Sequence, residues 1–446
     1  MESAPLAGHR GPGSQRRATT RALHIAAQVR TSYQVDLGGI GAFLPARVPT
    51  DDLPRALRPY LLACGELPNR YPQGGGGVRE WLDRCFRTDP PAVRQAVEAL
   101  DAAEADALMT ALAVLGHTYR WDSVPPLAER FAERSIELPP GILGPWSQLA
   151  RRLDQPRVGS AWSLHLTNWR MPDRQGGDSY RAGELNRPVL RIAHTWLAPP
   201  LADQLESFSL AFVLMEAMGA AVLDGLVDAI ECAAADASDG VLAALDRVHI
   251  AIMAMTLGFS RNVRPRTVDP TIWLEVIQPT FAWGAEACDA GRIGGGPSGM
   301  QLGIIQALDA AFTVGGRSGM AQMAGAARRH MPRRHRRFLS TLDQAGPLLR
   351  AFVTDGGSPE LAARFDACVL ALARFRVTHR ARGAQYLRNR SPSEVPRAST
   401  GLTIGIHDDP VSTFDQSMNE RIAETYEAML DPDQRREVGH PHVVGT

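Results

Sequence analysis

The 446-residue sequence contains no lysine, so arginine supplies every basic side chain apart from histidine. It also lacks an excess of either charge, because its 48 basic side chains balance 48 acidic ones. Proteins that bind nucleic acid or anionic membranes generally carry a basic excess. The balanced charge therefore argues against both kinds of partner.

Cysteine is scarce, and its pattern excludes two further classes of protein. The five cysteines are scattered, odd in number and free of C-x-x-C pairs. Neither a disulfide framework nor a zinc knuckle is indicated by this spacing. We expect a reducing, cytoplasmic location.

Long hydrophobic runs are missing as well. The longest, residues 208–223, is interrupted by Glu216 and is shorter than the roughly 20 residues that a membrane span needs. We expect it to be a buried core helix. The first 25 residues are polar and lack the apolar segment of a signal peptide, so they are predicted to form a disordered tail.

Helical patterns dominate, and strand signals are sparse. The polar stretch Arg170–Asn186 is the best candidate for a domain boundary. We therefore predict an all-α protein with a smaller domain over residues 26–185 and a larger one over 186–446. The predicted helices are 92–115, 207–232, 241–257, 301–312, 319–330 and 359–386.

One helical segment, residues 365–379, places a histidine on an otherwise apolar stripe. Phe365, Cys368, Leu372, Arg376 and His379 recur at spacings that share one helical face. Burial disfavours the charged imidazole, and a neutral imidazole can offer its lone pair to a metal. The alternative is an exposed basic helix end, which the helix dipole favours.

Three other motifs are weaker. The glycine-rich stretch 291–299 lacks the G-K-[ST] ending of a phosphate loop. The basic run 328–337 contains packing residues such as Met331 and Phe338, so a nucleic-acid site is not favoured. His330 and His335 lack the H-E-x-x-H frame of a zinc site.

Several short motifs occur along most of the chain in a characteristic order. They are Tyr33-Gln-Val-Asp36, Gly41-Ala-Phe-Leu-Pro45, Leu53-Pro54, His117-Thr-Tyr-Arg-Trp121, Leu138-Pro-Pro140, Pro145-Trp146, Asn168-Trp169, Gly294-Gly-Gly-Pro-Ser-Gly299, Gln306-Ala-Leu-Asp309 and Arg328-Arg-His-Met-Pro332 followed by His335-Arg336 and Phe338-Leu339. In this order they resemble the indoleamine 2,3-dioxygenase family of haem enzymes, with His330 where that family has tyrosine.

The resemblance implies an all-α, two-domain haem dioxygenase fold with the haem in the larger, C-terminal domain. It makes His379 the expected iron ligand of haem b, and Arg376, one turn earlier, could meet a haem propionate. Dioxygen would be the co-substrate, and an external electron donor would supply the ferrous state. The oligomeric state stays open.

The same resemblance suggests residues around the substrate. Phe208 and Trp273 fall where the family has aromatic side chains near the substrate ring, and Ser298 matches a serine that borders the haem edge. Thr400 matches a threonine of a loop that closes over the substrate, although Ser399 and Leu402 replace glycines there. The alternatives are ordinary core packing for the aromatics and turn formation for Ser298 and Thr400.

Three positions depart from the family pattern. Gln278 stands where an arginine binds the substrate carboxylate, and it has no charge. Phe212 replaces a small serine, and His165 lies in a pocket-lining stretch that is usually apolar. Tryptophan bound in the usual way is therefore doubtful, unless His165 or another arginine replaces the anchor. A small misregister of the counting would also account for all three.

The expected reaction is insertion of dioxygen into the C2–C3 bond of an indole-type substrate, with a modified or absent carboxylate. A first alternative is monooxygenation or ring rearrangement of a tryptophan derivative in specialised metabolism. A second is a non-catalytic haem or gas sensor.

Overall fold

The computed structural model describes residues 12–71, 77–122, 136–281, 296–356, 358–387 and 410–439. Nearly all regular structure in these residues is helical, which confirms the expected all-α class. The α-helices are α1 Pro12–Asp36, α2 Arg58–Arg70, α3 Val78–Cys85, α4 Pro91–Ala99, α5 Ala102–Trp121, α6 Pro140–Leu153, α7 Leu201–Ala234, α8 Ser238–Asn262, α9 Pro270–Ile272, α10 Gln278–Phe281, α11 Gly303–Ala311, α12 Gly319–Ala327, α13 Arg333–Asp355, α14 Pro359–Leu387, α15 Pro410–Glu427 and α16 Pro432–Gly439.

Shorter elements complete this list. Two π-helical turns, η1 (Trp162–Leu166) and η4 (Trp273–Ile277), flank α7 and α8 in the sequence. Three-residue 3₁₀ turns are η2 (Ala182–Glu184), η3 (Arg187–Val189), η6 (Gly299–Gln301) and η7 (Arg328–His330). The strands β1 (Trp169–Arg170) and β2 (Arg191–Ile192) pair antiparallel, with Trp169 opposite Ile192.

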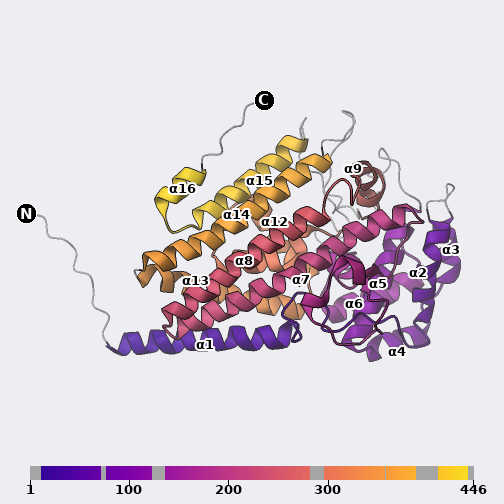
Figure 1. Ribbon diagram of the computed structural model, residues 1–446. Coiled ribbons are helices and arrows are strands. Elements are labelled where there is room, and N and C mark those ends of the chain that lie inside the picture. The colour runs from indigo at the N-terminus through magenta and orange to yellow at the C-terminus, as the bar shows by residue number, and fades with distance from the viewer. Residues whose placement is uncertain are drawn as a thin grey trace, which may run out of the picture.

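Long helices lie alongside one another through most of the molecule, whereas α2 to α6 gather at one end (Figure 1). Helix α8 packs against both α7 and α14, and α14 packs against α15. Helix α1 packs against α13 and α7, although the sequence analysis places its second half, residues 26–36, in the smaller domain. Apolar side chains form two clusters, one mainly in α2 to α6 and one mainly in the long helices. The domain limits themselves stay a prediction.

Helix α7 is a core helix, as the interrupted apolar run predicts. By length and composition alone, α7 and α8 could each cross a membrane. In α7, 72% of the most apolar window is buried inside the protein, compared with 39% in α8. Glu216, the interrupting residue, is completely buried.

Two predictions of local structure are wrong. The expected single helix over 92–115 is two helices, because Asp101 caps α5 and interrupts the run. The Asp101 carboxylate accepts from the Glu104 N–H at 2.8 Å, and the Glu104 carboxylate accepts from the Asp101 N–H at 2.8 Å, which is a capping box. Residues 12–25, expected in a disordered tail, belong to α1.

Candidate functional site

The structure brings four of the predicted substrate residues together. The rings of His165, Phe208, Phe212 and Trp273 form an aromatic cluster with Phe281, which the sequence analysis missed. His165 stacks on Phe212 with ring centroids 4.3 Å apart and meets Phe281 edge-on at 4.9 Å. Phe208 lies 5.4 Å from Phe212, 5.9 Å from Phe281 and 6.3 Å from Trp273. We call these five residues the aromatic cluster.

Local structure explains how residues far apart in sequence meet in this cluster. Phe208 and Phe212 are four residues apart on α7, so they share one face of the helix. His165 and Trp273 each lie on a π-helical turn, η1 and η4. π-helical turns are rare and often occur at functional sites. Phe208, Phe212 and Trp273 are only partly buried, so this side of the cluster is accessible.

His165 is the polar member of the aromatic cluster. It is 1% exposed, and neither ring nitrogen makes a well-aligned hydrogen bond to a residue that the structure describes, although the Leu164 backbone is close to the ring. Burial lowers the pKa of His165 to about 3, so the ring is neutral near pH 7. Buried polar atoms are nearly always paired, so two unpaired nitrogens on one ring call for an explanation.

A second buried histidine, His117, contacts two segments that carry residues of the aromatic cluster. The Gly159 N–H donates to His117 Nε2 at 3.1 Å, just before η1. Nε2 is therefore an acceptor, and the proton on Nδ1 can be donated to the Thr280 carbonyl at 3.2 Å. A Cβ at position 159 would lie 2.4 Å from Nε2, so this approach requires glycine. His117 therefore connects the segment before η1 to α10.

The predicted iron ligand, His379, lies on α14 among three phenylalanines. The rings of Phe259, Phe375 and Phe414 lie 5.8, 6.4 and 6.2 Å from the His379 ring. The ring is only partly exposed. Burial, and secondarily the charge of Arg376, lowers the pKa of His379 to about 4. A neutral imidazole with a free lone pair fits the ligand chemistry of haem iron.

His379 and the aromatic cluster lie on the same side of α14. Trp273 contacts Tyr386 of α14 with ring centroids 5.6 Å apart. Tyr386 follows His379 by seven residues, or two turns, so the two side chains share a helix face about 10 Å apart along the axis. His379 and the aromatic cluster therefore lie near each other along one face of α14.

Arg376, the predicted propionate partner, already has protein partners. Its Nη2 pairs with Asp309 of α11, and its Nη1 donates to the Thr425 hydroxyl of α15. Asp309 also pairs with Arg421 at 2.6 Å, and Arg421 pairs with Glu424 at 2.7 Å. Arg376 as a whole is 4% exposed. Arg376 therefore joins α11 and α15 to the helix that carries His379.

Of the three remaining predicted residues, the structure describes two, Gln278 and Ser298. Gln278 is buried at the start of α10, three residues before Phe281. The Ser298 hydroxyl accepts from the Met300 N–H at 3.2 Å and begins η6, as a turn-forming serine does. Thr400 lies outside the described residues.

The end of the glycine-rich stretch is anchored at two points that the sequence analysis missed. The Gln301 amide donates to the Gly296 carbonyl at 2.9 Å and accepts from the Ala161 N–H, next to η1, at 2.5 Å. Glu216 of α7 accepts from the Gly303 N–H at 2.6 Å. Only tertiary packing reveals these partners, which are far apart in sequence.

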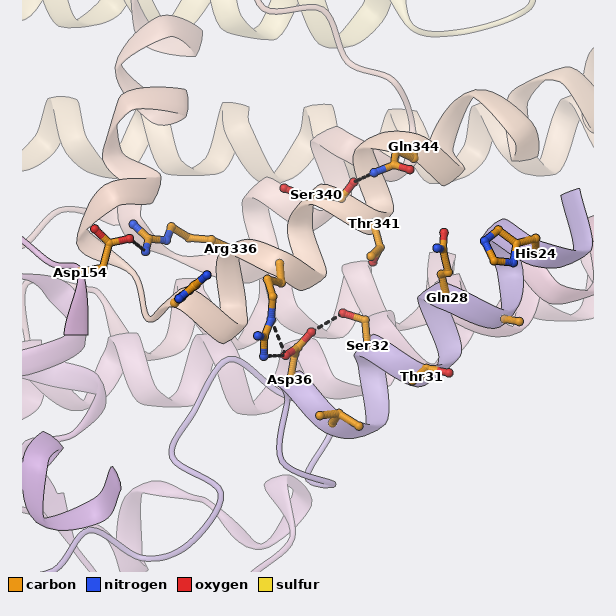
Figure 2. A pocket seen from close by; sticks show the side chains of 14 residues that line it. His24, Gln28, Thr31, Ser32, Asp36, Asp154, Arg336, Ser340, Thr341 and Gln344 are labelled. Atoms are coloured by element: carbon orange, nitrogen blue, oxygen red, sulfur yellow. Dashed lines mark hydrogen bonds and ion pairs between the residues drawn. The ribbon is translucent and has the colours of Figure 1, made fainter. Parts of the chain in front are cut away.

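A surface groove of about 1030 Å³ lies elsewhere, between α1 and α13 (Figure 2). None of the predicted site residues lines it. Two of its arginines are neutralised, because Arg336 pairs with Asp154 and Arg337 pairs with Asp36. The groove therefore lies apart from the aromatic cluster and from the predicted iron ligand. Within the described ranges, no three His, Cys, Asp or Glu side chains are grouped to hold a metal ion.

Comparison with known proteins assigns the class. The family model of indoleamine 2,3-dioxygenase matches residues 30–427, so the chain belongs to this family of dioxygenases and is an oxidoreductase. The family implies haem and an indole-type substrate.

Individual relatives are distant but extensive. The chain is 24% identical to indoleamine 2,3-dioxygenase 2 of Homo sapiens over 68% of its length and 75% of the relative. It is 24% identical to indoleamine 2,3-dioxygenase 1 of Rattus norvegicus over 79% of its length and 83% of the relative. A 6-hydroxytryptophan 2,3-dioxygenase of Fusarium equiseti is 22% identical over 83% of the chain and 88% of the relative.

Proposed function

We propose that this protein is a haem-dependent oxygenase that inserts dioxygen into the C2–C3 bond of an indole-type substrate without a standard carboxylate anchor. One observation supports this most: a neutral histidine on α14 shares a helix face with Tyr386, which contacts the aromatic cluster. Family membership supplies the reaction class.

Each part of the site has a role in this proposal. His379 would hold the iron of haem b, and the bound haem supplies the centre that activates dioxygen. Phe208, Phe212 and Trp273 would stack around the indole, fix its orientation and exclude water. Ser298 would border the haem edge. An external electron donor would reduce the haem.

The position of Gln278 supports a substrate other than plain tryptophan. An arginine can hold a carboxylate through two hydrogen bonds, whereas the amide of Gln278 has no charge to offer. The Fusarium equiseti relative is named for 6-hydroxytryptophan, so ring-modified substrates belong in the substrate panel.

The reaction is tested by aerobic turnover of a panel of indoles with detection of product mass. Two added oxygen atoms support the proposal. One added oxygen atom or a rearranged product points to the monooxygenase alternative, and no conversion by the reduced holoenzyme points to a sensor.

The iron ligand is tested by His379→Ala, which is expected to abolish stable haem incorporation. His24→Ala is the matched control, because His24 is exposed on α1 and belongs to the groove of Figure 2. Absorption in the Soret region reports haem uptake. A normal Soret band in purified His379→Ala would exclude His379 as the ligand.

A further inference from the structure

We propose that His165 determines specificity by hydrogen-bonding a neutral polar group, a hydroxyl or a ring N–H, on the aromatic part of the substrate. This inference rests on the proposed function, because it takes the aromatic cluster as the substrate site. It adds the chemistry that the cluster recognises.

The two ring nitrogens of His165 carry this inference. Nδ1 and Nε2 of His165 are both buried; the Leu164 backbone is close to the ring, but neither nitrogen makes a well-aligned hydrogen bond to any residue that the structure describes. Folding an imidazole into an apolar site without partners is unfavourable, and a phenylalanine there would avoid that cost. A ligand that pairs with the ring on binding accounts for a histidine at this position.

The position of the ring suggests which part of a ligand would reach it. His165 stacks on Phe212 and meets Phe208 edge-on at 5.8 Å. These two phenylalanines are partly accessible, and they suit a flat aromatic ligand. A group that approaches His165 therefore belongs to the ring system of the ligand rather than to its amino-acid tail.

The surroundings also exclude a carboxylate as the partner. Among the described residues, the aromatic rings that contact His165 belong to three phenylalanines: Phe208, Phe212 and Phe281. His117 is neutral as well, because burial lowers its pKa to about 3. A buried carboxylate beside an uncharged imidazole would lack a counter-charge, which is strongly unfavourable. The structure thus argues against His165 as a substitute for the missing arginine.

A neutral imidazole offers one N–H donor and one lone-pair acceptor. A hydroxyl can use either of them, whereas a ring N–H can use only the acceptor. Both are uncharged and small enough to approach a stacked ring. The two sources are distinguished by comparing hydroxyindoles and 1-methylindole with indole.

The test measures binding by titration calorimetry, which does not depend on the iron. The parent protein is titrated with indole, 1-methylindole and the 4-, 5-, 6- and 7-hydroxyindoles. We expect either one hydroxyindole to bind on the order of tenfold more tightly than indole, or 1-methylindole to bind on the order of tenfold more weakly. Equal affinity for all six ligands would overturn the proposal.

Two variants assign the preference to His165. His165→Phe fills the same space with an apolar ring and is expected to reduce the preference to less than threefold while indole itself still binds. His165→Gln restores a neutral donor and acceptor and is expected to recover part of it. A preference that survives in His165→Phe would also overturn the proposal. Failure of the proposed function is separate, because it would appear as absent haem uptake or absent turnover in the parent.

Discussion

Glu216 caps the helix that follows the glycine-rich stretch: its Oε1 accepts a hydrogen bond from the Gly303 N–H, the first residue of α11, at 2.6 Å. The Ile304 N–H lies 3.3 Å from Oε2. Glu216 follows Phe212 by one turn on α7. This single carboxyl group therefore joins the helix of the aromatic cluster to the segment that contains Ser298.

The first prediction is that Glu216 makes stability fall as pH rises. Burial raises the pKa of the Glu216 carboxyl from 4.5 to about 8, although the two backbone N–H groups oppose this shift. The folded state therefore holds the proton more tightly than the unfolded state between these pH values. The stability that this group contributes is complete below about pH 4.5 and is lost as pH rises through about 8.

Glu216→Gln tests this prediction, because glutamine keeps an oxygen for the Gly303 N–H but does not titrate. We expect the variant to gain stability relative to the parent as pH rises from 5 to 9. Thermal unfolding at a series of pH values measures the difference. Parallel curves for the two proteins would show that Glu216 does not titrate in this range.

The second prediction concerns the close packing at Gly303. A Cβ there would lie 2.2 Å from Cγ of Phe43, in the ring of a fully buried side chain. Gly303→Ala must displace this ring, and overpacking of this kind costs about 1–3 kcal/mol. Gly299→Ala is the matched control, since nothing lies within 4 Å of its Cβ position. Denaturant unfolding should show a loss for the first variant alone.

Sequence periodicity predicted the helices well where one apolar face is long, as in α7 and α14. The break between α4 and α5 was not predicted, although Asp101 followed by Glu104 is a capping-box pattern that the sequence displays. The resemblance of short motifs to a known family led to His165, Phe208, Phe212 and Trp273, which do meet in the structure.

Other features depend on contacts between distant residues, for which one sequence carries no signal. Nothing in the local pattern pairs Glu216 with Gly303 or Arg376 with Asp309. The π-helical turns that present His165 and Trp273 also follow from tertiary packing rather than from helix propensity.

The third prediction is that Asp309 is essential for stability. Its carboxylate pairs with Arg376 and Arg421, whose side chains are only 5% and 7% exposed. Asp309→Asn leaves two buried guanidinium groups without this counter-charge, and breaking such a pair costs about 3–5 kcal/mol. The measurement is the free energy of unfolding in urea.

Asp433→Asn provides the comparison, because Asp433 pairs with Arg436 at the surface, where the side chains are 82% and 75% exposed. Exposed pairs contribute about 0–1 kcal/mol. Similar losses for the two variants would mean that the cluster around Arg376 is solvated in solution.

The fourth prediction returns to the missing carboxylate anchor. If an uncharged Gln278 limits tryptophan binding, Gln278→Arg should lower the Kd for tryptophan by at least about tenfold, because a charged hydrogen bond contributes roughly 1.5–3 kcal/mol. Indole, which has no carboxylate, should bind the variant no more tightly than the parent.

Gln278→Met is the control, because it keeps a side chain of similar length without charge. It should strengthen the binding of neither tryptophan nor indole. Titration calorimetry with both ligands measures all three proteins. An arginine that strengthens indole and tryptophan binding equally would mean that position 278 shapes the pocket without meeting the carboxylate, and the anchor would then have to be sought on another element.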